Sequence, residues 1–439
     1  MKRWFSDGLF RAVLRNSSYL GAAKLVAAPL GLVALACAGR SLTATAFGLL
    51  MVIHSYADAA GALAKFQTWQ LIIRHGGPAL ARDDKQRVRD VIRFAFGLDI
   101  ASGIVGMVGA LVVLPFLAGR LGISGSTLTF ALIYCTLVPT MTAATPTGVL
   151  RLLDRFDLIA TQQLVTPLLR AAGALLSFFA HFGFPGFVVT WYVADITGDL
   201  VTWAFAAREL RRRDMADAFR PGLFGTARRL PGAWGFVWTT NIGHSVYAAW
   251  GPLSNIIVAS VLGPVAAGLY KIASTFLDST SKPADLLSRG FYPEIMRLDP
   301  ASKAPWRLGL RMATIAGLVG LVMLLIVAVG GKPLIVLSFG RKYLASYDLL
   351  RLMVWGLAVS MASFPLESLL YMVGRQRVAL AAQITATLLY LGALALLTTW
   401  IGLEGAGIAY LVGTLTMSTF MLVAVVTSYR RRHLPVEAR

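Results

Sequence analysis

Long apolar blocks recur along the whole chain and are separated by short polar stretches. A helix needs about 20 apolar residues to cross a bilayer, and the blocks approach or exceed that length. Twelve membrane-spanning helices are expected at residues 18–38, 43–65, 94–118, 127–150, 158–180, 186–207, 236–262, 265–288, 309–330, 348–373, 378–400 and 405–427. The pattern therefore predicts an all-α polytopic membrane protein.

The second half of the chain repeats the first at a shift of about 220 residues. Three stretches carry the match: SLTATAFGLLMVIHSYAD (41–58) with VLGPVAAGLYKIASTFLD (261–278), RLLDRFDLIATQQLVTPLL (151–169) with YMVGRQRVALAAQITATLL (371–389), and FGFPGFVVTWY (182–192) with IGLEGAGIAYL (401–411). An even number of helices per half orients both halves alike. We expect two parallel six-helix lobes, residues 1–215 and 216–439, related by a pseudo-two-fold axis along the membrane normal.

Composition and charge support this interpretation. Hydrophobic residues make up 57% of the chain and charged residues 14%, whereas soluble domains have about half and a quarter. The net charge is +20, but 30 of the 41 Lys and Arg residues fall in the termini and in alternate loops on one side. This positive-inside bias places both termini in the cytoplasm and argues against nucleic acid as a partner. The basic loops 74–93 and 208–229 are interpreted as topology anchors that touch anionic membrane lipids.

Sequence signatures of enzymes are missing. The chain has no P-loop, no H-E-x-x-H motif and no G-x-S-x-G elbow, and its five His and two Cys are scattered. No catalytic residue, metal or cofactor is predicted. The longest outer loop, residues 331–346, leaves no room for a catalytic domain, which disfavours a membrane glycosyltransferase or polymerase.

Two ionisable residues are expected at similar depth in neighbouring helices. Arg170 lies about 18 Å into the fifth span, and Asp195 lies at about the same height on the returning sixth span. A charge at the bilayer centre costs roughly 2.5–3.5 kcal/mol, so each needs a reason to be there. One reason is a structural ion pair between them. The other is that Arg170 binds an anionic headgroup, because its planar fork suits phosphate oxygens.

The repeat places a cation and an acid in each half. Lys24 aligns with His244, and Asp58 aligns with Asp278. Lys24–Asp58 and His244–Asp278 are therefore candidate pairs across the pseudo-two-fold axis. Snorkelling of Lys24 to the interface is the alternative.

The eighth span is the most charged of the twelve. Lys271, Asp278, Lys282 and Asp285 follow at intervals of seven, four and three residues, which puts them on one stripe of a helix. Such a stripe must face a wet interior rather than lipid, and it suits a headgroup that travels along the helix.

Other polar residues inside the spans have two interpretations. Asn241 could hydrogen-bond a sugar, or it could hydrogen-bond a neighbouring helix. Asp99 and Asp199 could carry protons or balance cations.

Three segments resemble a known family: LGPVAAGLYKIA (262–273), RLLDRFDLIATQQLV (151–165) and YPEIMRL (292–298). They are similar to the polysaccharide and oligosaccharide flippases of the multidrug/oligosaccharidyl-lipid/polysaccharide exporter superfamily. The resemblance implies an inverted-V fold, alternating access and a cationic central cavity in the bacterial inner membrane. It implies that a polyprenyl-pyrophosphate-linked glycan moves from the cytoplasmic to the outer leaflet, beside polymerases and glycosyltransferases. It also implies headgroup contacts for Lys24, Arg170 and Lys271.

Two other transporter classes compete with a flippase. An organic-cation exporter of the same fold should have acids and aromatic residues in its cavity and few cations. A facilitator of the major facilitator type should carry a G-x-x-x-D-R-x-G-R-R loop after its second span, and RHGGPALARDDKQRVRD (74–90) does not supply it.

Overall fold

The computed structural model describes residues 8–142, 144–296 and 298–430. Within its helices, the side chains of several stretches, among them 8–18, 242–247 and 281–290, are outside this description. The regular elements of the described residues are all helices.

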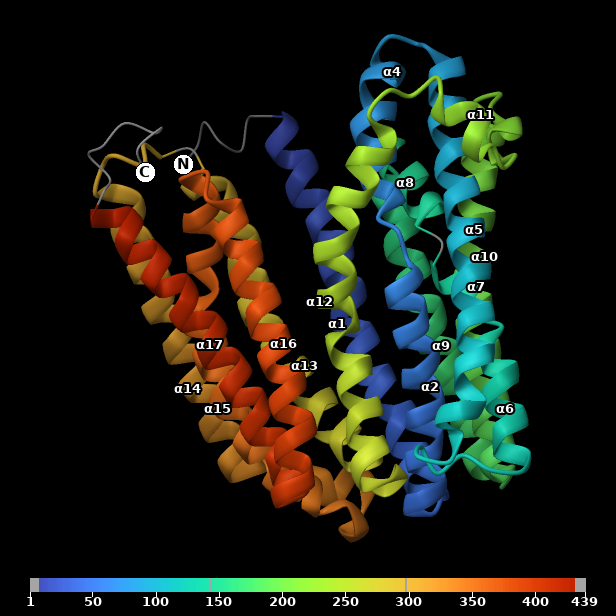
Figure 1. Cartoon of the computed structure of the whole chain (residues 1–439), viewed down its shortest axis with the longest axis vertical. Helices are drawn as coiled ribbons and strands as arrows, with labels where there is room; N and C mark the ends of the chain where they lie inside the picture. Colours follow the sequence, from blue (N-terminus) through green and yellow to red (C-terminus); the bar gives the residue numbers. More distant parts are fainter. Residues whose placement is uncertain (1–7, 143, 297, 431–439) are drawn as a thin grey trace. The chain divides into compact units, whose positions relative to one another are not determined.

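Each of the twelve expected spans lies on helix (Figure 1). The long helices are α1 (Gly8–Ser41), α2 (Ala44–Ala64), α5 (Lys85–Ala118), α9 (Phe156–Phe179), α10 (Gly183–Arg211), α12 (Ala233–Leu262), α13 (Pro264–Ile295), α14 (Ala304–Phe339), α15 (Ala345–Met372), α16 (Gln376–Ile401) and α17 (Leu403–Arg430). The fourth expected span is divided into α6 (Ser126–Cys135), α7 (Val138–Thr142) and α8 (Thr145–Leu152). Short elements connect the long helices: α3 (Thr68–Leu71), η1 (Ile72–Gly76), α4 (Gly77–Ala81), η2 (Ala216–Phe219), α11 (Leu223–Ala227) and η3 (Arg341–Tyr343).

Eight segments of the described residues are long and apolar enough to cross a membrane. They contain α1, α2, α5, α6 to α8, α14, α15, α16 and α17. Helices α9 and α10 are also long enough, with 24 and 29 residues. The mean hydropathy of these two helices is lower because α9 contains Arg170, and α10 contains Asp195 and Asp199. The ionisable residues inside α9 and α10 therefore account for two of the four expected spans outside these eight segments, the other two being α12 and α13.

The chain forms two compact units. The first contains residues 1–119 and 123–253, and the second contains residues 120–122 and 254–439. The boundary between them falls inside α12, so the start of this helix packs in the first unit and its end in the second.

The doubling of the sequence reappears in the helix boundaries. Helices α2 and α13, α9 and α16, and α10 and α17 each begin 220 residues apart. Arg155 and Arg375 occupy the N-cap positions of α9 and α16. Arg155 donates to Glu209 near the end of α10, and Arg375 donates to Ser428 near the end of α17. The two halves thus share local contacts as well as helix order.

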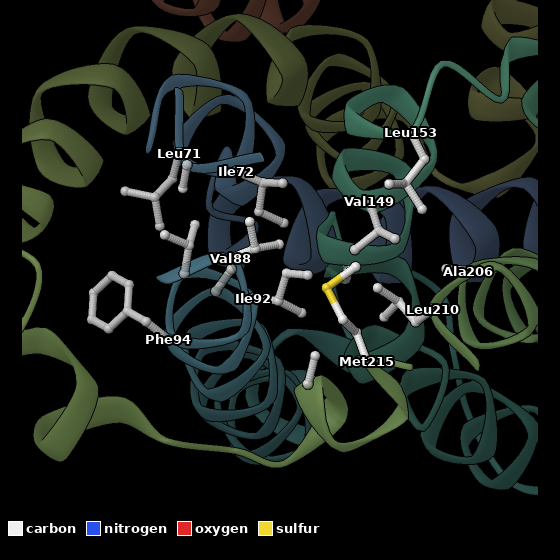
Figure 2. Close-up of a cluster of buried hydrophobic side chains, with 14 of the residues drawn as sticks. Leu71, Ile72, Val88, Ile92, Phe94, Val149, Leu153, Ala206, Leu210 and Met215 are labelled. Atoms are coloured by element: carbon white, nitrogen blue, oxygen red, sulfur yellow. The ribbon is translucent and has the colours of Figure 1, made fainter. Parts of the chain in front are cut away.

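An apolar core fills one end of the first unit. Figure 2 shows Leu71 and Ile72 beside Val88 and Ile92, with side chains from α8, α10 and the following loop completing the cluster. Met215, in that loop, is 1% exposed. The segments expected to be basic loops are therefore packed onto the ends of the helices.

Ion pairs hold the loop after α10 against the start of α5. Arg229 makes two hydrogen bonds of 2.8 Å to the carboxylate of Asp90, which is 5% exposed. Arg93 and Arg89 both pair with Asp217. This loop belongs firmly to the first unit.

The fourth span is broken where its sequence reads VPTMTAATP (138–146). Proline removes a backbone donor and clashes with the preceding turn, so a continuous helix is unfavourable here. The buried Asp99 of α5 accepts hydrogen bonds from the backbone N–H groups of Ala144 and Thr145, at 2.8 and 2.7 Å, and from the hydroxyl of Thr68. Asp99 therefore caps the restarted helix, a structural task that differs from the proton or charge role considered for it.

Candidate functional site

Arg170 and Asp195 form a buried ion pair between α9 and α10. The guanidinium donates to one carboxylate oxygen of Asp195, and the two side chains are 20% and 8% exposed. Their contact confirms the expectation that equal depth on adjacent helices brings them together. Isolated charges here would be costly, and pairing removes most of that cost.

A chain of polar side chains extends from this pair to α2. The hydroxyl of Tyr134 donates to the second oxygen of Asp195 at 2.7 Å, and it lies 3.2 Å from His54 Nδ1. His54 Nε2 lies 3.2 Å from a carboxylate oxygen of Asp58, one helical turn further along α2. Five side chains thus form a continuous series: Arg170, Asp195, Tyr134, His54 and Asp58. We call this series the polar relay.

The Trp191 ring packs against two members of the polar relay, Arg170 and His54. Arg170 lies 4.7 Å from the centre of the Trp191 ring, and the His54 ring meets the same indole edge to face at 5.3 Å. The Nε atom of Arg170 and the indole nitrogen of Trp191 are buried and have no hydrogen-bond partner among the described residues. Both donors lack an acceptor, and because they are buried a ligand reaches them only if these side chains move.

The polar relay is not cationic by itself. Arg170 contributes one positive charge, and Asp195 and Asp58 contribute two negative charges, so the sum is −1 with neutral His54 and zero with protonated His54. This balance differs from the cationic cavity that the family resemblance implies. Any excess positive charge must come from other residues.

A second polar site lies beside the break in the fourth span. A cavity of about 180 Å³ is lined by Lys65, Thr140, Thr147, Gln162 and Asp199, with Thr202, Trp203, Met141 and Pro146 completing the wall. One carboxylate oxygen of Asp199 is buried and has no hydrogen-bond partner among the described residues. Interrupted helices beside polar cavities are typical binding regions of transporters.

The structure describes both side chains of one candidate pair across the repeat, Lys24–Asp58, and one side chain of the other, His244–Asp278. Lys24 lies exposed on α1, and Asp58 lies on α2 with His54 as its ion-pair partner. Asp278 lies exposed on α13. His244 lies on α12, but its side chain is outside the described residues. The Lys24–Asp58 and His244–Asp278 pairs stay predictions.

The expected stripe on the eighth span is described only in part. Lys271 is partly exposed on α13, and the side chains of Lys282 and Asp285 are outside the described residues. Asn241 is buried on α12 with no described partner for its carbonyl oxygen. Substrate contacts for these residues remain predictions.

Sequence reasoning overlooked His54, Tyr134 and Trp191. A signal was present for His54, because it precedes Asp58 by four residues on an apolar helix, which places both on one face. Nothing in the sequence indicated which face of α6 or α10 turns toward α2.

Comparisons with known proteins identify the family. A model described as polysaccharide biosynthesis protein matches residues 13–281. The chain belongs to the polysaccharide biosynthesis protein family. Inner membrane protein YghQ of Escherichia coli (strain K12) is 51% identical over 350 residues, which cover 80% of this chain and 99% of that relative. The family resemblance seen in the sequence is thus confirmed, and the chain is a multi-pass protein of an inner membrane.

Solved structures show the fold. An inward-facing multidrug resistance MATE family transporter of the MOP superfamily matches with a TM-score of 0.70 and 14% identity, covering 94% of each chain. The lipid II flippase MurJ in its inward closed conformation matches with a TM-score of 0.64 and 12% identity, covering 95% of this chain and 90% of MurJ. This chain and these two transporters therefore share one fold.

Proposed function

We propose that this protein is a flippase that moves a polyprenyl-pyrophosphate-linked oligosaccharide from the cytoplasmic to the outer leaflet of the inner membrane. The family, the inner-membrane relative and the fold shared with transporters and a lipid flippase support the proposal. The headgroup needs a protein to cross the bilayer, because each sugar hydroxyl moved into hydrocarbon without a hydrogen-bond partner costs about 4–8 kcal/mol. A polar path replaces the water around the headgroup while the polyprenyl tail stays in lipid.

The observation that carries the proposal is Arg170, a guanidinium held inside the first unit with donor capacity left over. A guanidinium fork binds phosphate oxygens through paired hydrogen bonds. Lys24, Lys271, Lys282 and His244 are the further candidate contacts of the headgroup, and Asn241 is the candidate hydrogen-bond partner of the sugar.

The unpartnered Nε of Arg170 is buried, so headgroup binding requires the guanidinium to move and to exchange Asp195 for the phosphate. A phosphate oxygen that takes the guanidinium of Arg170 leaves Asp195 without its cation. Proton uptake by the polar relay, at His54 or at one of its two acids, then restores the charge balance. In this scheme Asp58, Asp195, Asp199 and Asp278 are charge-balancing residues, and an inward proton gradient biases the cycle.

A second function has an observation in its favour. The polar relay contains two acids and Tyr134 and lies against Trp191, and such groups attract organic cations. MATE transporters share the fold. Export of an organic cation is therefore the alternative to flipping.

Purified protein in proteoliposomes separates the two functions. A fluorescent polyprenyl-pyrophosphate oligosaccharide is reduced by external dithionite only after it reaches the outer leaflet, and a cationic dye is followed in parallel. We expect protein-dependent flipping of the lipid and no movement of the dye. Movement of the dye without the lipid would establish the alternative.

The role of Arg170 is tested by the charge-balanced double variant Arg170→Gln/Asp195→Asn. We expect at least a tenfold loss of flipping in folded protein, since about 1.4 kcal/mol of lost headgroup binding suffices for that factor. Arg211→Gln, at the exposed end of α10, is the control and should flip at the unmodified rate. An unchanged rate in the double variant would remove Arg170 from the headgroup site.

A further inference from the structure

The second unit has an apolar groove of about 770 Å³ between α14, α15 and α17. Figure 1 shows α14 and α15 running together with α17. Small residues line part of it, including Gly309, Ala313 and Ala362. Leu310 and Leu422 also line it and are 70% and 50% exposed. Its volume and lining fit a hydrocarbon chain.

One end of this groove is basic. Lys303 and Arg307, one helical turn apart at the start of α14, line it and are both exposed. Neither forms an ion pair with a carboxylate of the described residues. Two neighbouring cations without acids are a suitable site for a phosphate group.

Aromatic residues mark the depth of the basic end. Trp306 packs edge to face against Tyr429 with 5.4 Å between ring centres, and both line the groove. The indole of Trp306 also donates a hydrogen bond of 3.1 Å to the carbonyl of Pro300. Trp and Tyr are enriched where a membrane meets water. The groove therefore runs from an interfacial, basic end into the apolar zone.

A neighbouring groove provides a comparison. It has a similar volume, about 780 Å³, lies between α16 and α17, and contains Arg375. Arg375 donates to the hydroxyl of Ser428 and to the carbonyl of Ala424. The guanidinium of Arg375 already donates hydrogen bonds within the protein, whereas Lys303 and Arg307 form no ion pair with a described acid. The α14–α15–α17 groove is the better headgroup site.

We propose that the α14–α15–α17 groove binds an anionic phospholipid, with its phosphate on Lys303 and Arg307 and one acyl chain along the groove. The charge bias of the sequence places this end in the cytoplasmic leaflet. A phospholipid carries its phosphate beside its chains at the interface, which matches a groove with its own cations. The proposed flippase substrate has its phosphate bound at the polar relay. The lipid site is thus independent of the transport function.

Native mass spectrometry of the full-length protein tests whether Lys303 and Arg307 bind the lipid phosphate. The protein is equilibrated in micelles that contain phosphatidylglycerol and phosphatidylcholine in equal amounts. We expect selective retention of phosphatidylglycerol, and a roughly thirtyfold weaker apparent affinity in Lys303→Gln/Arg307→Gln, at about 1 kcal/mol for each cation. Lys332→Gln, an exposed cation nearer the other end of α14, is the matched control and should retain the lipid.

Substitutions that fill the groove with a larger side chain test whether an acyl chain occupies it. Ala313→Phe or Ala362→Phe leaves both cations in place, and we expect each to lose retained phosphatidylglycerol; Ala313→Leu is the milder substitute if the larger side chain prevents folding. Equal retention of the two lipids, or unchanged retention in Lys303→Gln/Arg307→Gln, would overturn the proposal. Displacement of phosphatidylglycerol by equimolar polyprenyl phosphate would also overturn it, because the groove would then hold an isoprenoid tail.

Discussion

Breaking the Arg170–Asp195 pair from one side should destabilise the protein far more than removing both charges. In Arg170→Gln, the carboxylate of Asp195 stays buried at 8% exposure without its cation. It keeps the 2.7 Å hydrogen bond from Tyr134 and has His54 Nδ1 at 3.8 Å. Losing one partner of a buried pair costs about 3–5 kcal/mol. The remaining contacts place the expected loss near the lower value, about 3 kcal/mol.

The double variant Arg170→Gln/Asp195→Asn replaces the ion pair by two neutral amides that can hydrogen-bond each other. We expect it to lie within about 1–2 kcal/mol of the unmodified protein, because replacing a whole buried pair is often nearly neutral. At about 2–4 °C per kcal/mol, the single variant should melt roughly 6–12 °C lower. The double variant should recover most of that difference.

Thermal unfolding in detergent, followed by intrinsic fluorescence, measures Arg170→Gln, Asp195→Asn, the double variant and the control Arg211→Gln. The coupling between the two positions is the difference between the double variant and the sum of the singles. A double variant as unstable as that sum would refute the reasoning, because the two charges would then act independently.

Three further changes test other contacts of the first unit. Gly106→Ala should destabilise by about 1–3 kcal/mol, since its Cβ would meet another side chain at 2.5 Å, whereas Gly109→Ala in the same helix has open space and should melt unchanged or higher; equal melting of the two would contradict the packing. Arg229→Ala removes the partner of a buried acid on α5, so chymotrypsin should cut the loop after α10 faster, and an unchanged rate would show that the ion pair does not hold this loop. Arg155 lowers the pKa of Asp157, so this ion pair stabilises the protein above about pH 4 and its contribution is lost as the pH falls. The contribution is within about 1 kcal/mol because the acid is exposed. Asp157→Asn should therefore flatten the acid side of the plot of melting temperature against pH, and an unaltered plot would argue against the pair.

The sequence predicted the helices well because apolar length is a local property. Spans and their doubling follow from blocks of about 20 residues and from matched positions 220 residues apart. The Arg170–Asp195 contact was also predictable, since adjacent antiparallel helices with a rise of about 1.5 Å per residue bring equal depths together.

Contacts between helices distant in the chain were not predictable in the same way. One partner of Asp58 is His54 on its own helix, but the link from His54 to Tyr134 and Asp195 depends on how α6 and α10 are rotated toward α2. Periodicity cannot supply that rotation when a helix is apolar on most of its faces.

The broken fourth span likewise has one feature that was visible in the sequence and one that was not. Its prolines were visible at 139 and 146, yet the buried acid that caps the restarted helix comes from α5, about 45 residues earlier in the chain. The basic loops were likewise interpreted only as topology anchors that touch anionic lipids. Their ion pairs to α5 and their share of the apolar core depend on tertiary contacts that composition does not reveal.

The central claim concerns the headgroup that this protein carries across the bilayer. The most direct measurement compares, in one proteoliposome preparation, the flipping rates of a polyprenyl-pyrophosphate oligosaccharide and a neutral glycolipid with the same glycan. We expect the protein to accelerate the pyrophosphate-linked lipid at least tenfold more than the neutral one. Equal acceleration of both lipids, or of neither, would contradict phosphate recognition by Arg170 and with it the proposed mechanism.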